Sequence, residues 1–197
     1  MTPYFETVKS YVDVPVTDTG VESRSFFEAT DGLVQMFDLF GSGVFGFIQA
    51  DLKSNINGVR TRYEAQPDRC GTLEDLVRSA SSDPNQTAIP CLVRLMRGLS
   101  LTCKALQHMQ QDRGAELHVC FRRAYDDVLK QHHSWVIRSI VYVAIRAVPY
   151  RDDFYSKIAQ GGSREKLDDA LNKWLVGLDR IVQHMITFLH QGNYGRV

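Results

Sequence analysis

The chain has 197 residues, of which 44% are hydrophobic and 23% are charged, a composition typical of one folded domain and unlike that of a disordered chain. Its 23 basic and 23 acidic side chains give a net charge of zero, so no overall field attracts nucleic acid and we expect no such partner. The four cysteines lie at positions 70, 91, 103 and 120 without the close Cys/His spacing of a zinc site, which predicts reduced thiols and no metal.

Helical periodicity dominates the chain from about residue 23 onward, and alternating strand patterns are nearly absent. The predicted fold class is therefore all-α. We expect one domain over residues 23–197, with residues 1–22 as an N-terminal extension that packs on it.

The first helix is predicted over 23–40, with Ser23 or Ser25 as its cap and Gly41-Ser42-Gly43 as its end. A second helix over 44–64 carries apolar residues at spacings of three and four, which indicates a buried stripe. Further helices are predicted over 72–79, 87–111, 115–130, 134–147, 151–159 and 163–191.

No charged segment followed by an apolar run lies near Met1, and no apolar run approaches the ~18 residues that a membrane span needs. We therefore expect a cytoplasmic protein whose membrane contact is peripheral and transient.

Two polar residues, Asp51 and Asn55, interrupt the second predicted helix. Because they lie four residues apart, they share one face beside the apolar Leu52 and Ile56. An aspartate accepts hydrogen bonds while an asparagine donates and accepts, which suits a headgroup with hydroxyl and amide groups. A solvated helix flank is the ordinary alternative.

Arg94 and Arg97 interrupt the apolar run of the helix predicted over 87–111. Their spacing brings the two guanidinium groups near each other, and each offers a rigid fork of donors that matches carboxylate or phosphate. The alternative is a salt bridge within the protein.

The segment His132-His133-Ser134-Trp135 joins two predicted helices, where a neutral imidazole can donate to a carbonyl or phosphoryl oxygen. Adjacent histidines rarely converge on one ion and no third ligand stands nearby, so we predict no metal site and no cofactor. The chain has no nucleophile elbow, metal cluster or phosphate loop, and we do not expect an enzyme.

Ordered motifs at these positions resemble the glycolipid transfer protein family over nearly the whole chain, from Phe26 to Val197. These motifs are Phe37-Asp38-Leu39-Phe40-Gly41-Ser42, Ala50-Asp51-Leu52-Lys53-Ser54-Asn55-Ile56, Arg97-Gly98-Leu99, His132-His133-Ser134-Trp135 and Pro149-Tyr150-Arg151-Asp152-Asp153-Phe154. The opening Tyr4-Phe5-Glu6-Thr7, the tripeptide Asp13-Val14-Pro15 and the double histidine resemble the fungal heterokaryon-incompatibility branch most.

The resemblance implies a monomeric, two-layer helical sandwich of the glycolipid transfer protein type, which encloses an apolar lipid pocket. Its implied function is the transfer of a sphingolipid ligand between membranes. On this basis Asp51 and Asn55 bind the headgroup and the amide, and His133 hydrogen-bonds the ceramide carbonyl.

Two positions depart from the sugar-binding members of the family. Arg94 stands where those members carry a tryptophan on which a sugar ring stacks, and Gly58 stands where they carry a lysine. Ceramide-1-phosphate carriers are known for an arginine at the first of these positions. Since a guanidinium in a partly desolvated notch favours phosphate over a sugar face, we predict a phosphate headgroup, such as that of ceramide-1-phosphate, bound by Arg94 and Arg97.

The apolar faces of the predicted helices supply a candidate pocket for the lipid chains. We expect it to be lined by Leu33, Phe37, Phe40, Val44, Phe45, Ile48, Leu101, Val136, Ile140 and Ala144. Trp135, Tyr150 and Arg151 are predicted to contact the membrane, because amphipathic rings and basic side chains suit a lipid interface. A half-buried structural role is the alternative for Trp135.

Three further functions are compatible with the sequence. The chain could be a glycosylceramide carrier that tolerates Arg94, or a carrier of phosphoinositol sphingolipids. It could also be a lipid-sensing interaction protein in incompatibility or cell-death signalling.

Overall fold

The structure is a computed structural model that describes residues 1–40, 44–83 and 87–197. Its α-helices are α1 (Ser23–Met36), α2 (Val44–Ala65), α3 (Leu73–Ser81), α4 (Ala88–Gln111), α5 (Leu117–Val128), α6 (Trp135–Arg146), α7 (Arg151–Ala159) and α8 (Arg164–Gln191). Strands β1 (Val16–Thr17) and β2 (Gly20–Val21) form a short antiparallel pair in which Val16 lies opposite Val21. The predicted all-α fold class is confirmed, and the bounds of the later helices differ from the prediction by no more than a few residues.

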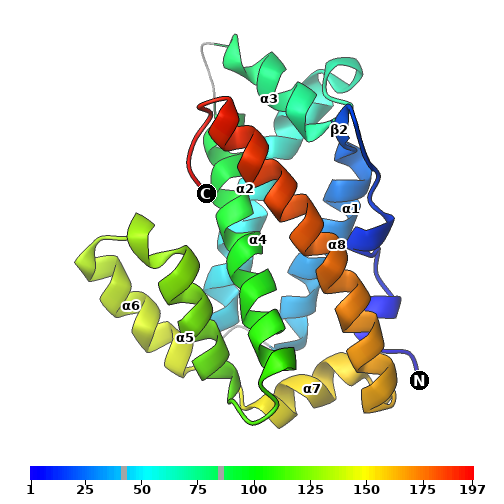
Figure 1. Ribbon diagram of the computed structural model, residues 1–197, viewed down its shortest axis with the longest axis vertical. Coiled ribbons are helices and arrows are strands. Elements are labelled where there is room, and N and C mark those ends of the chain that lie inside the picture. Colours follow the sequence, from blue (N-terminus) through cyan, green and yellow to red (C-terminus); the bar gives the residue numbers. More distant parts are fainter. Residues whose placement is uncertain (41–43, 84–86) are drawn as a thin grey trace.

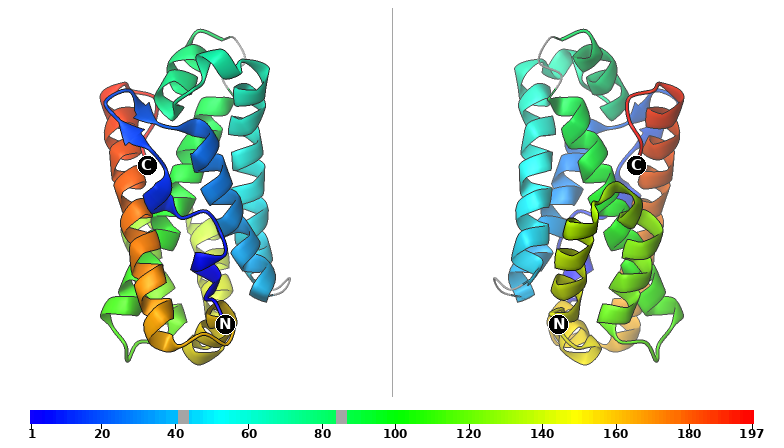
Figure 2. Two further views of the ribbon diagram at one scale, coloured as in Figure 1. Left: turned by 90° about the vertical axis from the view of Figure 1, so that its right-hand side faces the viewer. Right: turned by 90° about the vertical axis from the view of Figure 1, so that its left-hand side faces the viewer.

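The helices form two layers (Figure 1). α4 and α8 cross in the front layer, and α1 and α2 run behind them. The side views show the same separation, with α5 and α6 as an antiparallel pair beside α4 (Figure 2). The buried apolar residues of α1, α2, α4 and α8 form one continuous core between the layers, because each helix has a stripe of apolar residues at helical spacing.

Two helix ends differ from the prediction. Glu22, not Ser23 or Ser25, caps α1, since its carboxylate accepts from the backbone N–H groups of Arg24 and Ser25. The last turn of the first predicted helix, Phe37–Phe40, is a 3-10 helix. The Gly41-Ser42-Gly43 turn lies outside the described residues.

The N-terminal segment packs against α1 and α8. The Tyr11 hydroxyl donates to Thr30 Oγ1 at 3.0 Å, and the Tyr11 ring lies 4.9 Å from the Trp174 ring of α8. Gly177 of α8 allows this approach, because a Cβ there would overlap the backbone of Tyr11 and Val12.

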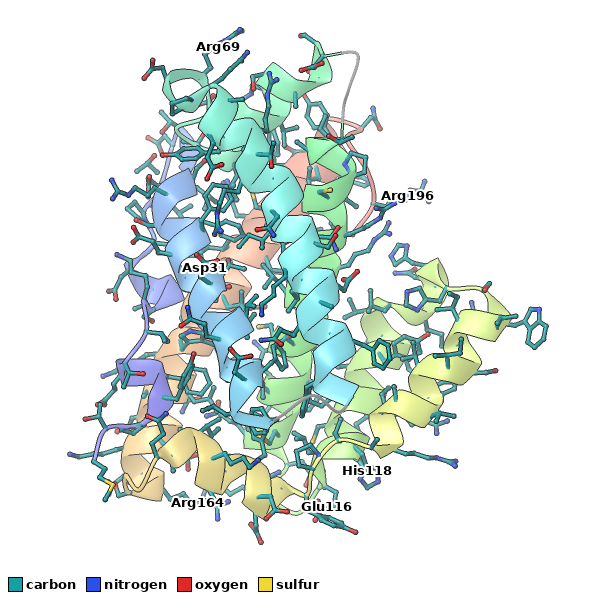
Figure 3. The ribbon with its side chains drawn as sticks, turned by 180° about the vertical axis from the view of Figure 1, so that it is seen from behind. Asp31, Arg69, Glu116, His118, Arg164 and Arg196 are labelled. Carbon is teal, nitrogen blue, oxygen red and sulfur yellow. The ribbon has the colours of Figure 1, made fainter. Side chains whose placement is uncertain are left out.

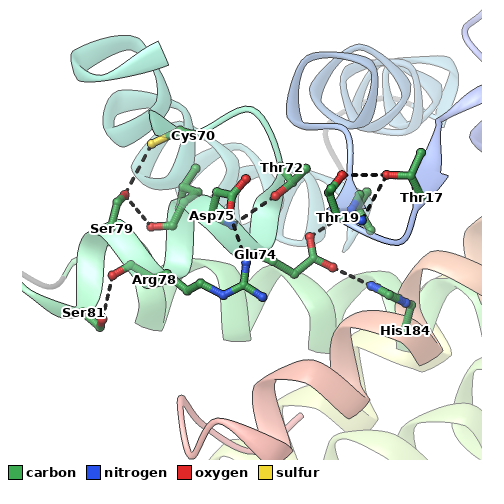
Figure 4. Close-up of polar contacts among 12 residues, drawn as sticks. Thr17, Thr19, Cys70, Thr72, Glu74, Asp75, Arg78, Ser79, Ser81 and His184 are labelled. Carbon is green, nitrogen blue, oxygen red and sulfur yellow. Dashed lines mark hydrogen bonds and ion pairs between the residues drawn. The ribbon is translucent and has the colours of Figure 1, made fainter. Parts of the chain in front are cut away.

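A buried carboxylate connects α3 with β2 and α8 (Figure 4). Glu74 is 2% exposed, and it accepts from the Val21 backbone N–H at 2.9 Å and lies 2.5 Å from His184 Nε2. His184 therefore connects α8 with α3. Within the described residues, no helix is both long and apolar enough to cross a bilayer.

Candidate functional site

A cavity of about 540 Å³ lies between α2, α4, α5 and α6. Apolar side chains form most of its wall, and its polar lining consists of Asp51, Arg94, Arg97, Tyr125, His132 and His133. The fold thus gathers four of the five predicted headgroup residues, which come from three separate segments of the chain, at one cavity.

The fifth residue, Asn55, is turned toward the core. It is 4% exposed, it does not line the cavity, and its Nδ2 donates to the Asp51 carbonyl at 2.9 Å. Such a bond to the preceding helical turn satisfies a polar side chain on a buried face. Asp51 itself is exposed and lines the cavity. Of the two predicted residues, only the Asp51 carboxylate therefore faces the cavity, and the Asn55 amide is buried.

Arg94 and Arg97 present two cations from α4. Among the residues that the structure describes, neither forms a salt bridge, so the alternative of an internal ion pair is not realised there. Burial lowers the pKa of Arg97, and the neighbouring charge of Arg94 lowers that pKa further. An anion between the two groups would relieve this repulsion.

The C-terminal tail closes one side of the Arg97 site. Arg97 Nε donates to the Arg196 carbonyl at 2.9 Å, and its Nη2 donates to the same oxygen. Figure 3 shows Arg196 on the tail beside α4. Tyr194 stacks on Phe188 with ring centroids 5.5 Å apart and so attaches the tail to α8. Sequence reasoning missed this contact, because a backbone carbonyl has no signature in the sequence.

The two histidines are held in a partly desolvated, cationic setting. Burial lowers the pKa of both His132 and His133, and the charge of Arg97 lowers each pKa further. Asp51 raises the pKa of His133 by a smaller amount. Both imidazoles are therefore neutral near pH 7 and can act as directed hydrogen-bonding groups.

Tyr125 is a cavity residue that the sequence analysis did not identify. It is fully buried, and its hydroxyl lies 3.0 Å from Nδ1 of His133. Burial raises the pKa of Tyr125, which keeps the phenol protonated and able to donate. If the phenol donates to Nδ1, the His133 proton resides on Nε2. In the sequence, the position of Tyr125 eight residues before His133, on the preceding helix, was the one indication that the two side chains could meet.

The predicted chain-lining residues divide into three groups. Ile48, Leu101, Ile140 and Ala144 line the cavity. Leu33, Phe37, Phe40 and Phe45 lie in or against the adjoining core, where Phe40 stacks on Phe154 with centroids 4.8 Å apart. Val136 is exposed and does not line the cavity, and the side chain of Val44 lies outside the described part. Contact of these residues with lipid chains stays a prediction.

Several apolar lining residues were not predicted. They are Phe47, Leu52, Phe121, Leu129, Val141, Ile145 and Val148. They come from α2, α5, α6 and the turns just after α5 and α6. Phe47 is 82% exposed, whereas the others are buried or half-buried and supply apolar wall beside the polar groups.

The three predicted membrane residues have different environments. Trp135 and Tyr150 are 78% and 73% exposed, which leaves both rings available to an interface. Arg151 is only 5% exposed, and its guanidinium donates to the carbonyls of Met109 in the last turn of α4 and of Asp112 and Ala115 in the segment that follows it. The prediction for Arg151 is therefore corrected, since this arginine satisfies terminal helix carbonyls instead of facing lipid.

Gly58 marks a close crossing of α2 and α4. A Cβ at this position would lie 2.5 Å from Cys91 Sγ, so the helices leave no space for a side chain. Arg60, further along α2, pairs with Asp31 of α1 at 2.7 Å. Neither Gly58 nor Arg60 therefore supplies a cation to the cavity. Among the described residues, the arginines that line it are Arg94 and Arg97.

The chemistry that this cavity supports is binding. The described residues contain no cluster of histidine, cysteine, aspartate and glutamate side chains that could hold a metal ion. The polar groups supply two cations, one carboxylate and neutral imidazole and phenol groups beside an apolar wall, an arrangement suited to a molecule with a polar head and hydrocarbon chains.

Comparisons with known proteins agree with this geometry. The family model described as Glycolipid transfer protein (GLTP) matches residues 21–160. A glycolipid transfer protein of Aureobasidium melanogenum is 38% identical and covers 94% of this chain and 92% of its own length. One from Danio rerio is 32% identical and covers 87% of this chain and 83% of its own.

Solved structures show the same arrangement of helices. The crystal structure of HET-C2, a fungal glycolipid transfer protein, has a TM-score of 0.88 at 37% identity and covers 95% of this chain and 96% of that one. Mouse ceramide-1-phosphate transfer protein has a TM-score of 0.87 at 22% identity, with 98% of each chain covered, and so shares the fold.

Proposed function

Since the chain belongs to the glycolipid transfer protein family, whose members are lipid carriers and not enzymes, we propose that its cargo is a sphingolipid with a phosphate headgroup. Ceramide-1-phosphate is the simplest lipid of this kind. The apolar part of the cavity takes the chains, and the polar groups at α2, α4 and the α5–α6 junction take the headgroup and the ceramide amide.

The observation that carries this proposal is the charge of the cavity. Arg94 and Arg97 lie beside a single lining carboxylate, Asp51, and both histidines are neutral near pH 7 because their pKa values are lowered. An excess positive charge in a partly desolvated cavity favours an anionic ligand, and guanidinium forks match phosphate oxygens. A neutral sugar would leave this charge uncompensated.

The ceramide groups have partners of their own in this proposal. His133 donates from Nε2 to the ceramide carbonyl, and Asp51 accepts from the amide N–H or from a headgroup hydroxyl. Asn55 holds the α2 backbone at Asp51 and acts indirectly, since its amide is bonded to the Asp51 carbonyl. Trp135 and Tyr150 contact the membrane while the cargo enters or leaves.

A glycosylceramide is the second candidate cargo. It is favoured by the relatives, because the protein of Aureobasidium melanogenum and HET-C2 are both described as glycolipid transfer proteins at 38% and 37% identity. The charge of the cavity is the reason for placing it second.

Vesicle-to-vesicle transfer of fluorescent lipids with one acyl chain and different headgroups tests the proposal. We expect the wild type to transfer ceramide-1-phosphate at least about tenfold faster than glucosylceramide or galactosylceramide, which is the factor that ~1.4 kcal/mol of headgroup selectivity gives. Faster transfer of either glycosylceramide would contradict the phosphate assignment. Binding without net transfer of any lipid would instead support the lipid-sensor function.

A phosphoinositol ceramide belongs in the same series. It has a phosphodiester beside the ceramide, so the two arginines would also bind it. Transfer of this lipid at the rate of ceramide-1-phosphate would identify the phosphate as the feature recognised, whereas its exclusion would show that the cavity requires a terminal phosphate.

A further inference from the structure

The turn that carries His132 and His133 joins α5 to α6. The chain leaves α5 at Val128, forms the 3-10 turn Lys130–His132 and enters α6 at Trp135. His133 lies between the turn and the helix in an extended conformation, with φ of −112° and ψ of 139°. Because His133 belongs to neither element, individual hydrogen bonds fix its backbone.

Arg138, near the start of α6, supplies a central part of this restraint. Its Nε lies 2.9 Å from the carbonyl oxygen of Lys130 and 2.9 Å from that of His133, so one N–H is shared between the two acceptors. The Lys130 carbonyl also accepts from the His133 backbone N–H at 3.3 Å. Arg138 thus contacts both the carbonyl of His133 and the acceptor of its N–H, and it fixes the backbone on both sides of the His133 side chain.

The ring of His133 is restrained by a separate contact. The Tyr125 hydroxyl lies 3.0 Å from Nδ1, and the centroids of the two rings are 5.7 Å apart. The phenol can set the tautomer of the imidazole. A ring directs its other nitrogen at a ligand accurately only when the residue that carries it is also held in place. Tyr125 and Arg138 therefore restrain different parts of the same residue.

The other properties of Arg138 favour a supporting role over direct contact with cargo. It is half-buried, and it is not among the described residues that line the cavity between α2, α4, α5 and α6, which we call the cargo cavity. Within the described part of the chain it forms no salt bridge, so carbonyl oxygens are the partners of its Nε. Burial lowers the pKa of His133 most, followed by the charge of Arg97 and then by that of Arg138.

We propose that Arg138 is a positioning residue for cargo binding. By donating to the carbonyls of Lys130 and His133, it holds the His133 backbone so that Nε2–H of the ring faces the ceramide carbonyl. Because the ceramide part is common to all candidate cargo lipids, this contribution is independent of the headgroup. The proposal rests on the carrier function and on the role of His133 in it, and it gives Arg138 no contact with lipid.

Two replacements of equal reach test the proposal, with equilibrium binding of ceramide-1-phosphate and of glucosylceramide to the full chain as the measurement. Arg138→Met places a methyl carbon where Nε stood, and it should weaken binding of both lipids by the same factor of about three to ten, as expected for one hydrogen bond. Arg138→Gln places an amide nitrogen at that position, because Nε and the glutamine nitrogen are both the fourth atom of the side chain. It should bind both lipids within about twofold of the wild type.

A pH titration of the His133 resonances by NMR separates hydrogen bonding from charge. Both Arg138 variants should raise the pKa of His133, because each removes a charge that lowers it. Only Arg138→Met should also lose binding. Arg146→Met is the matched control, since Arg146 is exposed near the other end of the same helix, and it should change neither the binding of either lipid nor the pKa of His133.

A double-mutant cycle tests whether Arg138 acts through His133. In the His133→Ala background, Arg138→Met should cause no further loss of binding, because the group that it positions is already absent. If Arg138→Met does not fold, Arg138→Lys replaces it in both comparisons. Lysine moves the donor one bond beyond the position of Nε, so this variant should bind both lipids more weakly than Arg138→Gln.

Three results would overturn the proposal. A loss confined to ceramide-1-phosphate would identify Arg138 as a phosphate-binding cation. Equal losses in Arg138→Met and Arg138→Gln would show that charge, and not the shared hydrogen bond, is the cause. A further loss in the His133→Ala background would show that Arg138 acts independently of His133. Failure of the phosphate-cargo proposal remains distinguishable, since that proposal concerns the ratio of affinities between the two lipids and this one concerns a loss common to both.

Discussion

Arg94 is the residue on which the proposed headgroup selectivity depends. It is exposed at the cavity, three residues before the half-buried Arg97, and only Asp51 among the lining residues offsets the two charges. Its partner Arg97 already has a neutral acceptor in the Arg196 carbonyl. Arg94 is therefore the cation with more freedom to follow a phosphate.

Replacement of this residue gives the first prediction. A charge-assisted hydrogen bond contributes roughly 1.5 to 3 kcal/mol, so Arg94→Leu should lower transfer of ceramide-1-phosphate by about one to two powers of ten. Arg94→Lys should lose less, since it retains the charge but not the fork. The measurement is the transfer rate of fluorescent ceramide-1-phosphate between vesicles, and an unchanged rate for Arg94→Leu would remove Arg94 from the headgroup site.

Tyr125 gives the second prediction, because its hydroxyl lies 3.0 Å from Nδ1 of His133. A phenol that donates to Nδ1 keeps the imidazole proton on Nε2, where it can reach a ligand carbonyl. In ¹⁵N NMR spectra the wild type should show the Nε2–H tautomer, and Tyr125→Phe should show a mixture together with a roughly threefold to tenfold loss of transfer, as expected for one hydrogen bond.

Tyr142→Phe is the matched control for this change. It removes a phenol of α6 whose hydroxyl donates to Asp126 and not to His133, at 2.7 Å. The His133 tautomer should be unaffected in this variant. A wild-type protein with the proton on Nδ1 would contradict the assigned role of Tyr125.

At the scale of elements, the sequence predicted the helices correctly where a periodic pattern of apolar residues determines the secondary structure. The apolar stripes predicted the helices, because burial of such a stripe is what stabilises them. The predicted serine cap of α1 was wrong. Glu22, the residue before the predicted helix, accepts from the free backbone N–H groups of its first turn. The membrane role expected of Arg151 was wrong because its guanidinium donates to three backbone carbonyls, in the last turn of α4 and in the segment just after it, and no local pattern reveals these partners.

The docking of the N-terminal segment on α8 gives the third prediction. A Cβ at Gly177 would overlap the backbone of Tyr11 and Val12, so Gly177→Ala should lower the free energy of unfolding by about 1 to 3 kcal/mol, even though alanine favours helix. Gly46→Ala in α2 is the control, since nothing lies within 4 Å of its Cβ position. Urea unfolding should show no loss for this second variant, and a similar loss in both would mean that the close contact is not the cause.

At the scale of the whole molecule, the fourth prediction concerns pH. Burial, and then the charge of Arg97, lower the folded-state pKa values of His132 and His133 below 6.5. Between each folded value and 6.5 the unfolded chain binds more protons, so stability rises with pH there and falls as pH drops below 6.5. Thermal unfolding as a function of pH should show this loss, and His132→Asn should reduce it. A cargo-free protein that becomes more stable on acidification through this window would contradict the desolvated, cationic setting of the histidines.

The candidate site was only partly predictable, for a physical reason. Asp51, Arg94, Arg97 and His133 could be proposed because a polar side chain on an apolar helix face needs a partner. Their convergence on one cavity, the inward turn of Asn55 and the contribution of Tyr125 depend on how α2, α4, α5 and α6 cross. Those crossings are set by contacts between distant segments, such as Gly58 against Cys91, which are not encoded in any local motif.

Equilibrium competition at the cargo cavity tests the central claim most directly, because it separates headgroup recognition from the membrane steps of transfer. Ceramide-1-phosphate and glucosylceramide with the same acyl chain would compete against one fluorescent ligand for the wild-type protein. Two guanidinium groups beside one carboxylate predict that ceramide-1-phosphate binds more tightly by about tenfold or more. Equal affinities, or tighter binding of glucosylceramide, would contradict the phosphate assignment.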